Sequence, residues 1–402
     1  MTIEVIHGDV LEVLADRMDE EFTAVFCDPP YGYDFMQKDW DHGVPGVSCW
    51  SEILRMSVPG ALLLAFGGTR TYHRLTCAIE DSGYQIFDCL MWLHGQGFPK
   101  SNDISKSIDK AAGAERKVVG KHLGVPGLST IKGWNDGPWS RGEAGNITAP
   151  ATPDATTWSG YGTSLKPAWE PCVVARKPRE GTYAQCAVAH GSGALWIDGG
   201  RLPYVNEAVP DLAHWKKTSG GWKNTSTKGV VPNDNSKGRW PANLVINHEA
   251  ATMIGEQAER FFYCTKPAAG EKDAGLDGFY WRVDESVAFG YVPVTFTEWQ
   301  LLDEKKRAIG NVHPTVKPID LCRYYAKLIR PPESYLDDAV LCVPFSGTGS
   351  EIIGAMLAGW KNIVGVDNSE HSCEIARARI ENWQYAYEES GSSDVKALRK
   401  WM

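Results

Sequence analysis

An acid, two prolines and an aromatic residue follow a short apolar run near the start of the chain. The run 23–27 is typical of a buried parallel strand, and Asp28-Pro29-Pro30-Tyr31 comes directly after it. Open α/β sheets bind ligands at the carboxyl ends of their strands. Prolines fix φ and lack an N–H, so the turn is stiff. Asp28 and a proline carbonyl can accept hydrogen bonds from an amino group while Tyr31 stacks on a flat ring. The alternative is an ordinary strand-ending turn.

A glycine-rich turn near the other end of the chain follows a second apolar run, 339–343. Phe345-Ser346-Gly347-Thr348-Gly349 leads into a predicted helix, 350–358, and then into an apolar strand that ends at Asp367. Strand, glycine turn, helix, strand and acid form the nucleotide-binding half of a doubly wound sheet. The acid lies about 20 residues past the glycines, where it can hold ribose hydroxyls.

The residues around this turn argue against a pyrophosphate. A dinucleotide-binding turn would have a third glycine where Ile352 stands, and Asp338 and Glu351 place negative charge nearby. A cationic nucleoside without phosphate, such as S-adenosylmethionine, fits this turn better.

With a third phrase, His313-Pro314-Thr315-Val316-Lys317-Pro318, the chain resembles the DNA amino-methyltransferases, which methylate the N6 of adenine or the N4 of cytosine. The catalytic phrase precedes the cofactor phrase, as in the permuted class called beta. Residues 31–41 and 162–171 are similar to solitary methylases of phages and prophages. Asp at the first catalytic position favours N6-adenine, and N4-cytosine is the alternative. A nucleotide-dependent oxidoreductase and an inactive DNA-binding homologue are the other readings.

The resemblance implies S-adenosyl-L-methionine as cofactor, DNA as partner and a base flipped out of the duplex. It implies Asp28, Pro29, Pro30 and Tyr31 as catalytic residues. The implied cofactor-binding residues are Asp9, Asp28, His313, Thr315, Lys317, Phe345, Gly347, Thr348, Gly349, Asp367 and Asn368. Asp9 is equally suited to cap a helix over 10–15, and Lys317 can be a plain surface lysine. Tyr33, Lys38 and Trp40, after the catalytic turn, can steer DNA or close a lid.

The charge of the chain requires that its DNA contacts be gathered in one place. The formal net charge is −9, whereas phosphate contacts need Lys and Arg. The stretch 211–240 mixes basic residues with Trp, Gly and Ser, which suits a segment that grips a sugar–phosphate backbone. A solvated surface loop is the alternative. The predicted contacts are Lys216, Lys217, Lys223, Lys228, Lys237 and Arg239.

We expect an α/β fold: a doubly wound, seven-stranded, mostly parallel Rossmann-like sheet, circularly permuted, with long inserts. The strands are predicted at 3–7, 23–27, 60–66, 84–93, 170–176, 339–343 and 363–366. The catalytic half spans 1–95, a core strand 166–177 and the cofactor half 311–402. The inserts 96–165 and 178–310 are candidates for target recognition, and apolar runs at 244–246 and 261–264 indicate that part of the second packs on the core.

Composition is compatible with this interpretation. The chain has 402 residues, 43% of them hydrophobic, with no run long enough to span a membrane and no signal-peptide pattern. Its 10 cysteines include no C-x-x-C pair. We therefore expect a cytoplasmic protein with reduced cysteines and no metal site. A homodimer is left open, and no nuclease or helicase signature indicates restriction in the same chain.

Overall fold

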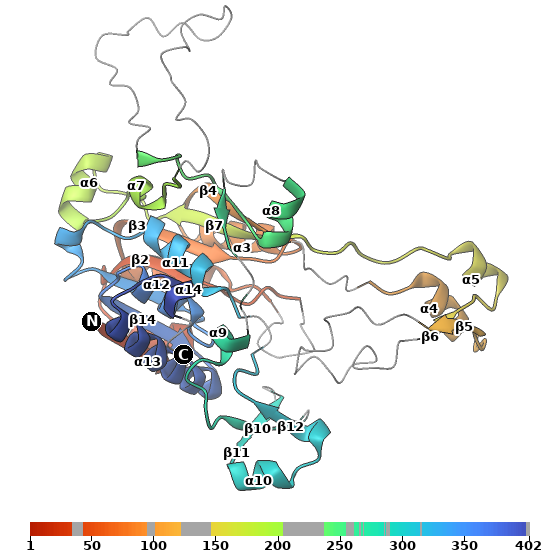
Figure 1. Ribbon diagram of the computed structural model, residues 1–402. Helices are drawn as coiled ribbons and strands as arrows, with labels where there is room; N and C mark the ends of the chain where they lie inside the picture. The colour runs from red at the N-terminus through yellow and green to blue at the C-terminus, as the bar shows by residue number, and fades with distance from the viewer. Residues whose placement is uncertain are drawn as a thin grey trace, which may run out of the picture. The chain divides into compact units, whose positions relative to one another are not determined.

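The computed structural model describes residues 1–33, 43–94, 101–121, 146–203, 237–254, 261–264, 267, 269–284, 286, 290–313 and 316–398. The chain divides into two compact units (Figure 1). The first unit holds residues 1–94, 170–275 and 315–402, and the second holds residues 95–169 and 276–314.

The first unit is built on a sheet that has nine strands within the described residues. In spatial order they are β1 (Thr2–His7), β14 (Asn362–Asp367), β13 (Val340–Pro344), β2 (Phe22–Cys27), β3 (Ser57–Phe66), β7 (Trp169–Arg176), β4 (Gln85–Leu93), β8 (Leu244–Ile246) and β9 (Phe262–Tyr263). The first five run parallel to one another, and β7 is antiparallel to β3. β4, β8 and β9 are again parallel to one another.

The two ends of the chain share this sheet. Residues 2–7 pair in parallel register with residues 362–367, so red β1 and blue β14 are neighbours in Figure 1. This is the place at which the predicted permutation cuts the sheet. All seven predicted strands are present, and β8 and β9 extend the sheet beyond the prediction. Both come from the apolar runs of the second insert.

Helices cover both faces of the sheet because side chains alternate along each strand. In β3, Leu62 and Leu64 face one core, and Leu63 and Ala65 face the other. The first core is covered by α11 (Ile319–Leu328), α12 (Ser350–Leu357) and α13 (Glu370–Ser390). The second is covered by α1 (Val10–Ala15), α2 (Val47–Met56) and α3 (Tyr72–Asp81). The sheet is doubly wound, which confirms the predicted fold class.

Shorter helices of the first unit lie in its connections. They are α6 (Tyr183–His190), α7 (Ile197–Gly200), α8 (His248–Ile254), α9 (Ala269–Asp273), α14 (Val395–Leu398) and a 3₁₀ turn at Glu333–Tyr335. No helix in the described ranges is both long enough and apolar enough to cross a membrane.

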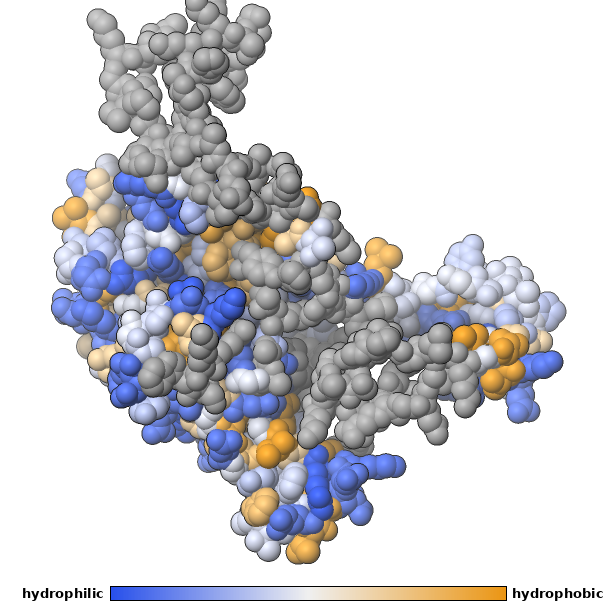
Figure 2. All heavy atoms as spheres, in the orientation of Figure 1, coloured by the Kyte–Doolittle hydropathy of each residue, from blue (hydrophilic) through white to orange (hydrophobic). Residues whose placement is uncertain are grey.

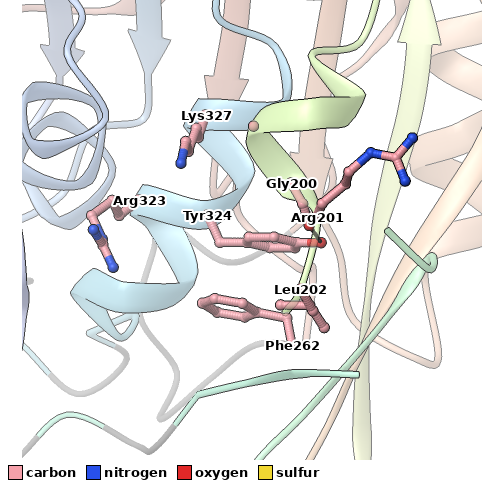
Figure 3. A pocket seen from close by; sticks show the side chains of 8 residues that line it. Gly200, Arg201, Leu202, Phe262, Arg323, Tyr324 and Lys327 are labelled. Atoms are coloured by element: carbon pink, nitrogen blue, oxygen red, sulfur yellow. Dashed lines mark hydrogen bonds between the residues drawn. The ribbon is translucent and has the colours of Figure 1, made fainter. Parts of the chain in front are cut away.

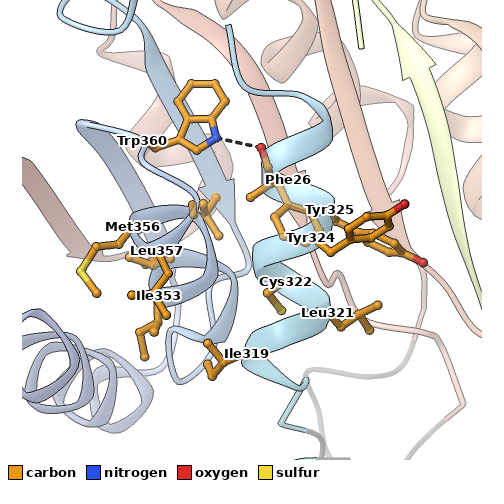
Figure 4. Packing of buried hydrophobic residues seen from close by; sticks show 14 of the residues in the cluster. Phe26, Ile319, Leu321, Cys322, Tyr324, Tyr325, Ile353, Met356, Leu357 and Trp360 are labelled. Carbon is orange, nitrogen blue, oxygen red and sulfur yellow. Dashed lines mark hydrogen bonds between the residues drawn. The ribbon is translucent and has the colours of Figure 1, made fainter. Parts of the chain in front are cut away.

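Aromatic rings fill the core between the sheet and α11. Tyr325 stacks on Phe66 with ring centroids 5.6 Å apart. Trp360 donates a hydrogen bond from Nε1 to the Ala326 carbonyl at 3.0 Å (Figure 4). α11 and α12 are in close contact at Gly354, where an added Cβ would lie 2.6 Å from the backbone nitrogen of Arg323. The lack of a side chain at this position lets the two helices pack.

The second unit consists of short elements. They are α4 (Ile104–Ala111), β5 (Val118–Lys121), β6 (Asn146–Thr148), α5 (Pro153–Thr157), β10 (Tyr280–Val283), β11 (Tyr291–Val294), α10 (Phe296–Leu301), a 3₁₀ turn at Glu304–Lys306 and β12 (Arg307–Ile309). Buried Asp109 organises its first segment by accepting hydrogen bonds from the N–H groups of Ala151 and Thr152, both at 3.0 Å. In its second segment, buried Trp281 donates to the Gly310 carbonyl at 2.9 Å.

Gly354→Ala should destabilise the first unit because the added methyl meets the backbone of α11. We expect the free energy of unfolding to fall by about 1–3 kcal/mol, the usual cost of overpacking, measured by urea denaturation. Gly270→Ala is the matched control, since that helical glycine has no atom within 4 Å of an added Cβ. Equal unfolding midpoints for the two variants would contradict the close packing of α11 on α12.

Candidate active site

The strand order of the first unit reverses between β13 and β2. From β13 the chain continues through α12 to β14 on one side, and from β2 it continues through α2 to β3 on the other. Open α/β sheets bind ligands outside the strand ends at such a switch point. The two predicted turns, 28–31 and 345–349, both lie at this point because they follow β2 and β13 directly.

The glycine turn has an unusual backbone. The φ angle is +59° at Phe345, +48° at Gly347 and +82° at Gly349, the residue before α12. A left-handed φ is strained for a bulky residue such as Phe345 and persists only where the surroundings fix it. The conformation therefore depends on neighbours that hold the turn in place.

Asp367 is one of these neighbours. Its carboxylate accepts hydrogen bonds from the N–H of Gly347 at 2.8 Å and the N–H of Ser369 at 2.9 Å. Burial raises the pKa of Asp367 above its usual value, although the two N–H groups favour the charged form. Asn368, beside it, is exposed. The acid at the end of β14 thus joins the two strand ends that form the predicted nucleoside site.

Lys317 lies at the centre of a buried polar cluster at the end of β2. Its Nζ donates to Asp28 Oδ2 at 2.5 Å and to the Tyr31 hydroxyl at 3.0 Å, and lies 3.5 Å from Glu170 Oε2. The Tyr31 hydroxyl in turn lies 2.9 Å from Asp28 Oδ1 and 3.2 Å from Glu170 Oε2. Only 5% of the Lys317 side chain is exposed, and its Nζ lies 4.8 Å from the ring centroid of Phe66.

Two carboxylates share this one ammonium group, and their pKa values shift in opposite directions. Burial raises the pKa of Glu170, but Lys317 and His94 outweigh burial and lower it to about 2. At Asp28 burial prevails, and its pKa is raised although Lys317 acts to lower it. Burial lowers the pKa of Lys317, and the two acids more than reverse that effect. Lys317 and Glu170 are therefore charged near neutral pH, and Asp28 is the more readily protonated acid.

Sequence reasoning does not single out Glu170 or His94. His94 is 4% exposed just after β4, and its Nε2 lies 3.4 Å from Glu170 Oε1. Its ring packs 5.1 Å from the ring of Trp92. The available signals were an acid near the start of a mostly apolar strand and a histidine at a strand end. Both patterns also have ordinary structural explanations.

A second group of buried charges lies behind the glycine turn. Arg379 on α13 is fully buried and donates to the Thr348 carbonyl at 2.5 Å and to the Glu271 carbonyl at 3.3 Å. The Glu271 carboxylate accepts from the N–H of Ile319, the first residue of α11, at 2.8 Å. These bonds connect the glycine turn with the start of the helix that follows Lys317.

The other predicted cofactor residues make local contacts. Asp9 caps α1, and its Oδ1 accepts from the N–H of Leu11 at 2.8 Å, which is the alternative role that the sequence allows. His313, in the second unit, donates from its backbone N–H to Asn311 Oδ1 at 3.0 Å. The cofactor contacts of Asp9 and His313 stay predictions.

The predicted DNA contacts are described only in part. The Tyr33 hydroxyl accepts from the N–H of Arg70 at 2.8 Å. Lys237 donates to Asp198 Oδ2 at 2.8 Å, and Arg239 pairs through its backbone with Leu202. The other residues predicted for DNA or cofactor binding lie outside the described residues: Thr315, Lys38, Trp40, Lys216, Lys217, Lys223 and Lys228.

The arrangement suits an amine ligand. Asp28 and its neighbouring backbone carbonyls offer hydrogen-bond acceptors, and Pro29 is buried. The hydrogen bonds of the Tyr31 hydroxyl group hold its ring in place. Acceptors that are fixed in advance stabilise positive charge developing on a nitrogen without having to reorganise.

Comparison with known proteins gives weak similarities. No family model matches the chain, and no curated protein matches it. Among solved structures, the M1.HpyAVI–SAM complex aligns with a TM-score of 0.41 and 11% identity over 94% of this chain and 99% of that one. TTHA0409 from Thermus thermophilus, a putative DNA modification methylase complexed with S-adenosyl-L-methionine, aligns with a TM-score of 0.38 and 13% identity over 95% of this chain and 94% of that one. PvuII DNA methyltransferase (cytosine-N4-specific) aligns with a TM-score of 0.40 and 10% identity over 100% of this chain and 94% of that one. These scores are too low to carry an argument, so the function must be inferred from the site itself.

Glu351, on the first turn of α12, should make stability depend on pH. It is 4% exposed; burial and the Asp28 charge raise its pKa to about 7 from its usual 4.5. A raised carboxyl pKa gives stability that is complete below about pH 4.5 and is lost as the pH rises through 7. We expect this residue to lower the free energy of unfolding by up to about 3 kcal/mol between pH 5 and 8.

The measurement is urea denaturation at stepped pH. Glu351→Gln should flatten this part of the profile, and exposed Glu381→Gln, on α13, is the control that should leave it unchanged. An identical pH dependence in Glu351→Gln and the unmodified protein would rule out Glu351 as the titrating group.

Proposed function

We propose that this chain is an S-adenosylmethionine-dependent DNA methyltransferase that acts on an exocyclic amine of a base flipped out of the duplex. One observation carries the proposal: the acid–aromatic turn 28–31 and the glycine turn 345–349 follow neighbouring parallel strands at the switch point of one sheet. The first turn offers acceptors to an amine, and the second offers a nucleoside site beside it.

The residues at the glycine turn fit the proposed cofactor. Asp367 is fixed against Gly347 and retains free acceptor positions for ribose hydroxyls. Ile352, at the place of a third glycine, is fully buried. The nearby carboxyl groups of Asp28 and Glu351 favour a cation over a pyrophosphate. When bound, S-adenosylmethionine supplies an electrophilic methyl group on a sulfonium.

The acceptors at Asp28 address the main difficulty of the reaction. The lone pair of an exocyclic amine is delocalised into the base, so the nitrogen is a poor nucleophile. Asp28 and the Pro29 carbonyl are proposed to accept the two amine hydrogens and free that lone pair. A carboxylate has about four acceptor positions, so Asp28 can take an amine hydrogen while it still holds Lys317 and Tyr31.

Tyr31 and Lys317 then have distinct proposed roles. The Tyr31 hydroxyl is tethered to Asp28, which limits how the ring can turn and suits it to stacking on the flipped base. Lys317 holds Asp28 in place and favours its ionised form, which accepts hydrogen bonds. A contact of Lys317 with the cofactor carboxylate remains part of the proposal and would compete with Glu170.

The acid in the first catalytic position favours N6-adenine as the target, with N4-cytosine as the alternative. The long inserts are proposed to recognise the target, and a phage-type solitary enzyme is the proposed biological class. The proposal assigns this chain the modification step alone and gives it no part in DNA cleavage.

The product can be tested directly. Genomic DNA from cells that express the protein should contain N6-methyladenine by nucleoside mass spectrometry. DNA from cells that express Asp28→Asn, which keeps the side-chain shape but weakens the acceptor, should lack it. Detection of N4-methylcytosine alone would make cytosine the target. The absence of any methylated base, with the protein shown to be folded, would refute the proposed activity.

Substitution of Asp367 should weaken cofactor binding without changing DNA binding. Asp367→Ala removes a charge-assisted acceptor worth about 1.5–3 kcal/mol, so the Kd for S-adenosylmethionine, measured by calorimetry, should rise about tenfold or more. The Kd for duplex DNA should not change. Asp28→Asn is the contrasting variant, since it should lower kcat with a smaller effect on cofactor binding. Unchanged cofactor affinity in Asp367→Ala would place the nucleoside elsewhere.

A further inference from the structure

A small pocket of the first unit lies between α7 and the outer side of α11 (Figure 3). Its floor is a pair of rings, Phe262 from β9 and Tyr324 from α11, stacked with centroids 3.9 Å apart and planes inclined by 7°. The Tyr324 hydroxyl donates to the Gly200 carbonyl at 3.4 Å. Because the two rings stack on each other, the character of the pocket is set by the polar residues of its wall.

That wall is cationic. Arg323 and Lys327, four residues apart, project from the same side of α11 (Figure 3). Arg330 follows three residues later, and Lys327 and Arg330 each lie 5.2 Å from the ring centroid of Trp196. Figure 2 shows hydrophilic residues over this α7 and α11 side of the first unit, with apolar residues among them. We call Arg323 and Lys327 of α11, together with Arg330 just beyond its end, the α11 basic row.

The row is only partly neutralised by its neighbours. Arg323 lies 3.6 Å from Asp320, and Arg330 pairs with Glu333. Among the described residues no carboxylate lies within ion-pair distance of Lys327. Burial, then Arg323 and Arg330, lowers the pKa of Lys327, as expected where like charges gather. Like charges held together at a surface are unfavourable unless an anion shares the site.

The other side of the pocket leads to the predicted basic stretch. Arg201 projects away from the α11 basic row (Figure 3), and its guanidinium lies 5.1 Å from the ring centroid of Trp240. Leu202 and Arg239 exchange backbone hydrogen bonds at 2.7 and 3.2 Å. The residues on either side of the segment 204–236 are thus paired with each other next to this pocket.

We propose that the α11 basic row binds the sugar–phosphate backbone of duplex DNA, a proposal that rests on the function proposed above. Arg323 and Lys327 are separated by about 6 Å along the helix axis, so they can reach neighbouring phosphates of one strand. Lys327 lies about 12 Å along the axis from Ile319, which starts α11 next to the Lys317 cluster. That length corresponds to about three or four base pairs. A duplex whose target base enters the site can therefore reach the row.

The test compares two double variants that remove the same charge. Arg323→Gln with Lys327→Gln changes the row, whereas Arg377→Gln with Lys396→Gln removes one arginine and one lysine elsewhere on the first unit. Affinity for a fluorescent duplex of about 20 base pairs is measured by anisotropy at stepped NaCl concentrations. The row variant should bind all sequences more weakly and flatten the log–log salt slope by up to about 1.8, or about 0.9 per lost contact. Arg323→Lys with Lys327→Arg should keep the slope.

The outcomes separate this proposal from the proposed function. Cofactor affinity and methylation at saturating DNA should stay as in the unmodified protein. If the row variant has the slope of the control variant while methylation is intact, the α11 basic row does not bind DNA. If the slope falls but no methylated base is found with any DNA, the row stands and the methyltransferase proposal fails. Loss of affinity for free ATP with an unchanged duplex slope would make the row a small-anion site and overturn the proposal.

Discussion

One buried positive charge holds the candidate site together. Lys317 is nearly inaccessible to solvent and is surrounded by Asp28, Glu170 and the Tyr31 hydroxyl. A buried charge that loses its partner costs several kcal/mol, whereas the complete cluster satisfies each of its members. The turn after β2, the start of β7 and the segment before α11 must therefore all be in place before any of them is stable in this arrangement.

This requirement makes the site depend on long-range order. Asp28 and Lys317 are 289 residues apart in the chain, and β1 at one end pairs with β14 at the other. The half that holds Asp28 cannot place this acid correctly without the half that supplies Lys317. The order of strands along this chain thus distributes the candidate site over both ends of the sequence.

Local patterns account for what the sequence could predict. The turns at 28–31 and 345–349 follow apolar strands, so their positions at strand ends follow from short-range rules. Glu170 and His94 meet only because antiparallel β7 lies between β3 and β4, which no local pattern encodes. The strands β8 and β9 are too short to be assigned from periodicity, although their apolar character predicted that this part of the insert packs on the core.

The helix α11 connects the parts of the first unit that the proposed function requires. It starts next to Lys317, and Glu271 holds its first N–H. Its side packs at Gly354 on α12, the helix that follows the glycine turn. Its outer side carries Arg323 and Lys327. In the proposed function, one helix thus adjoins both the Asp28–Lys317 pair and the proposed polyanion contacts.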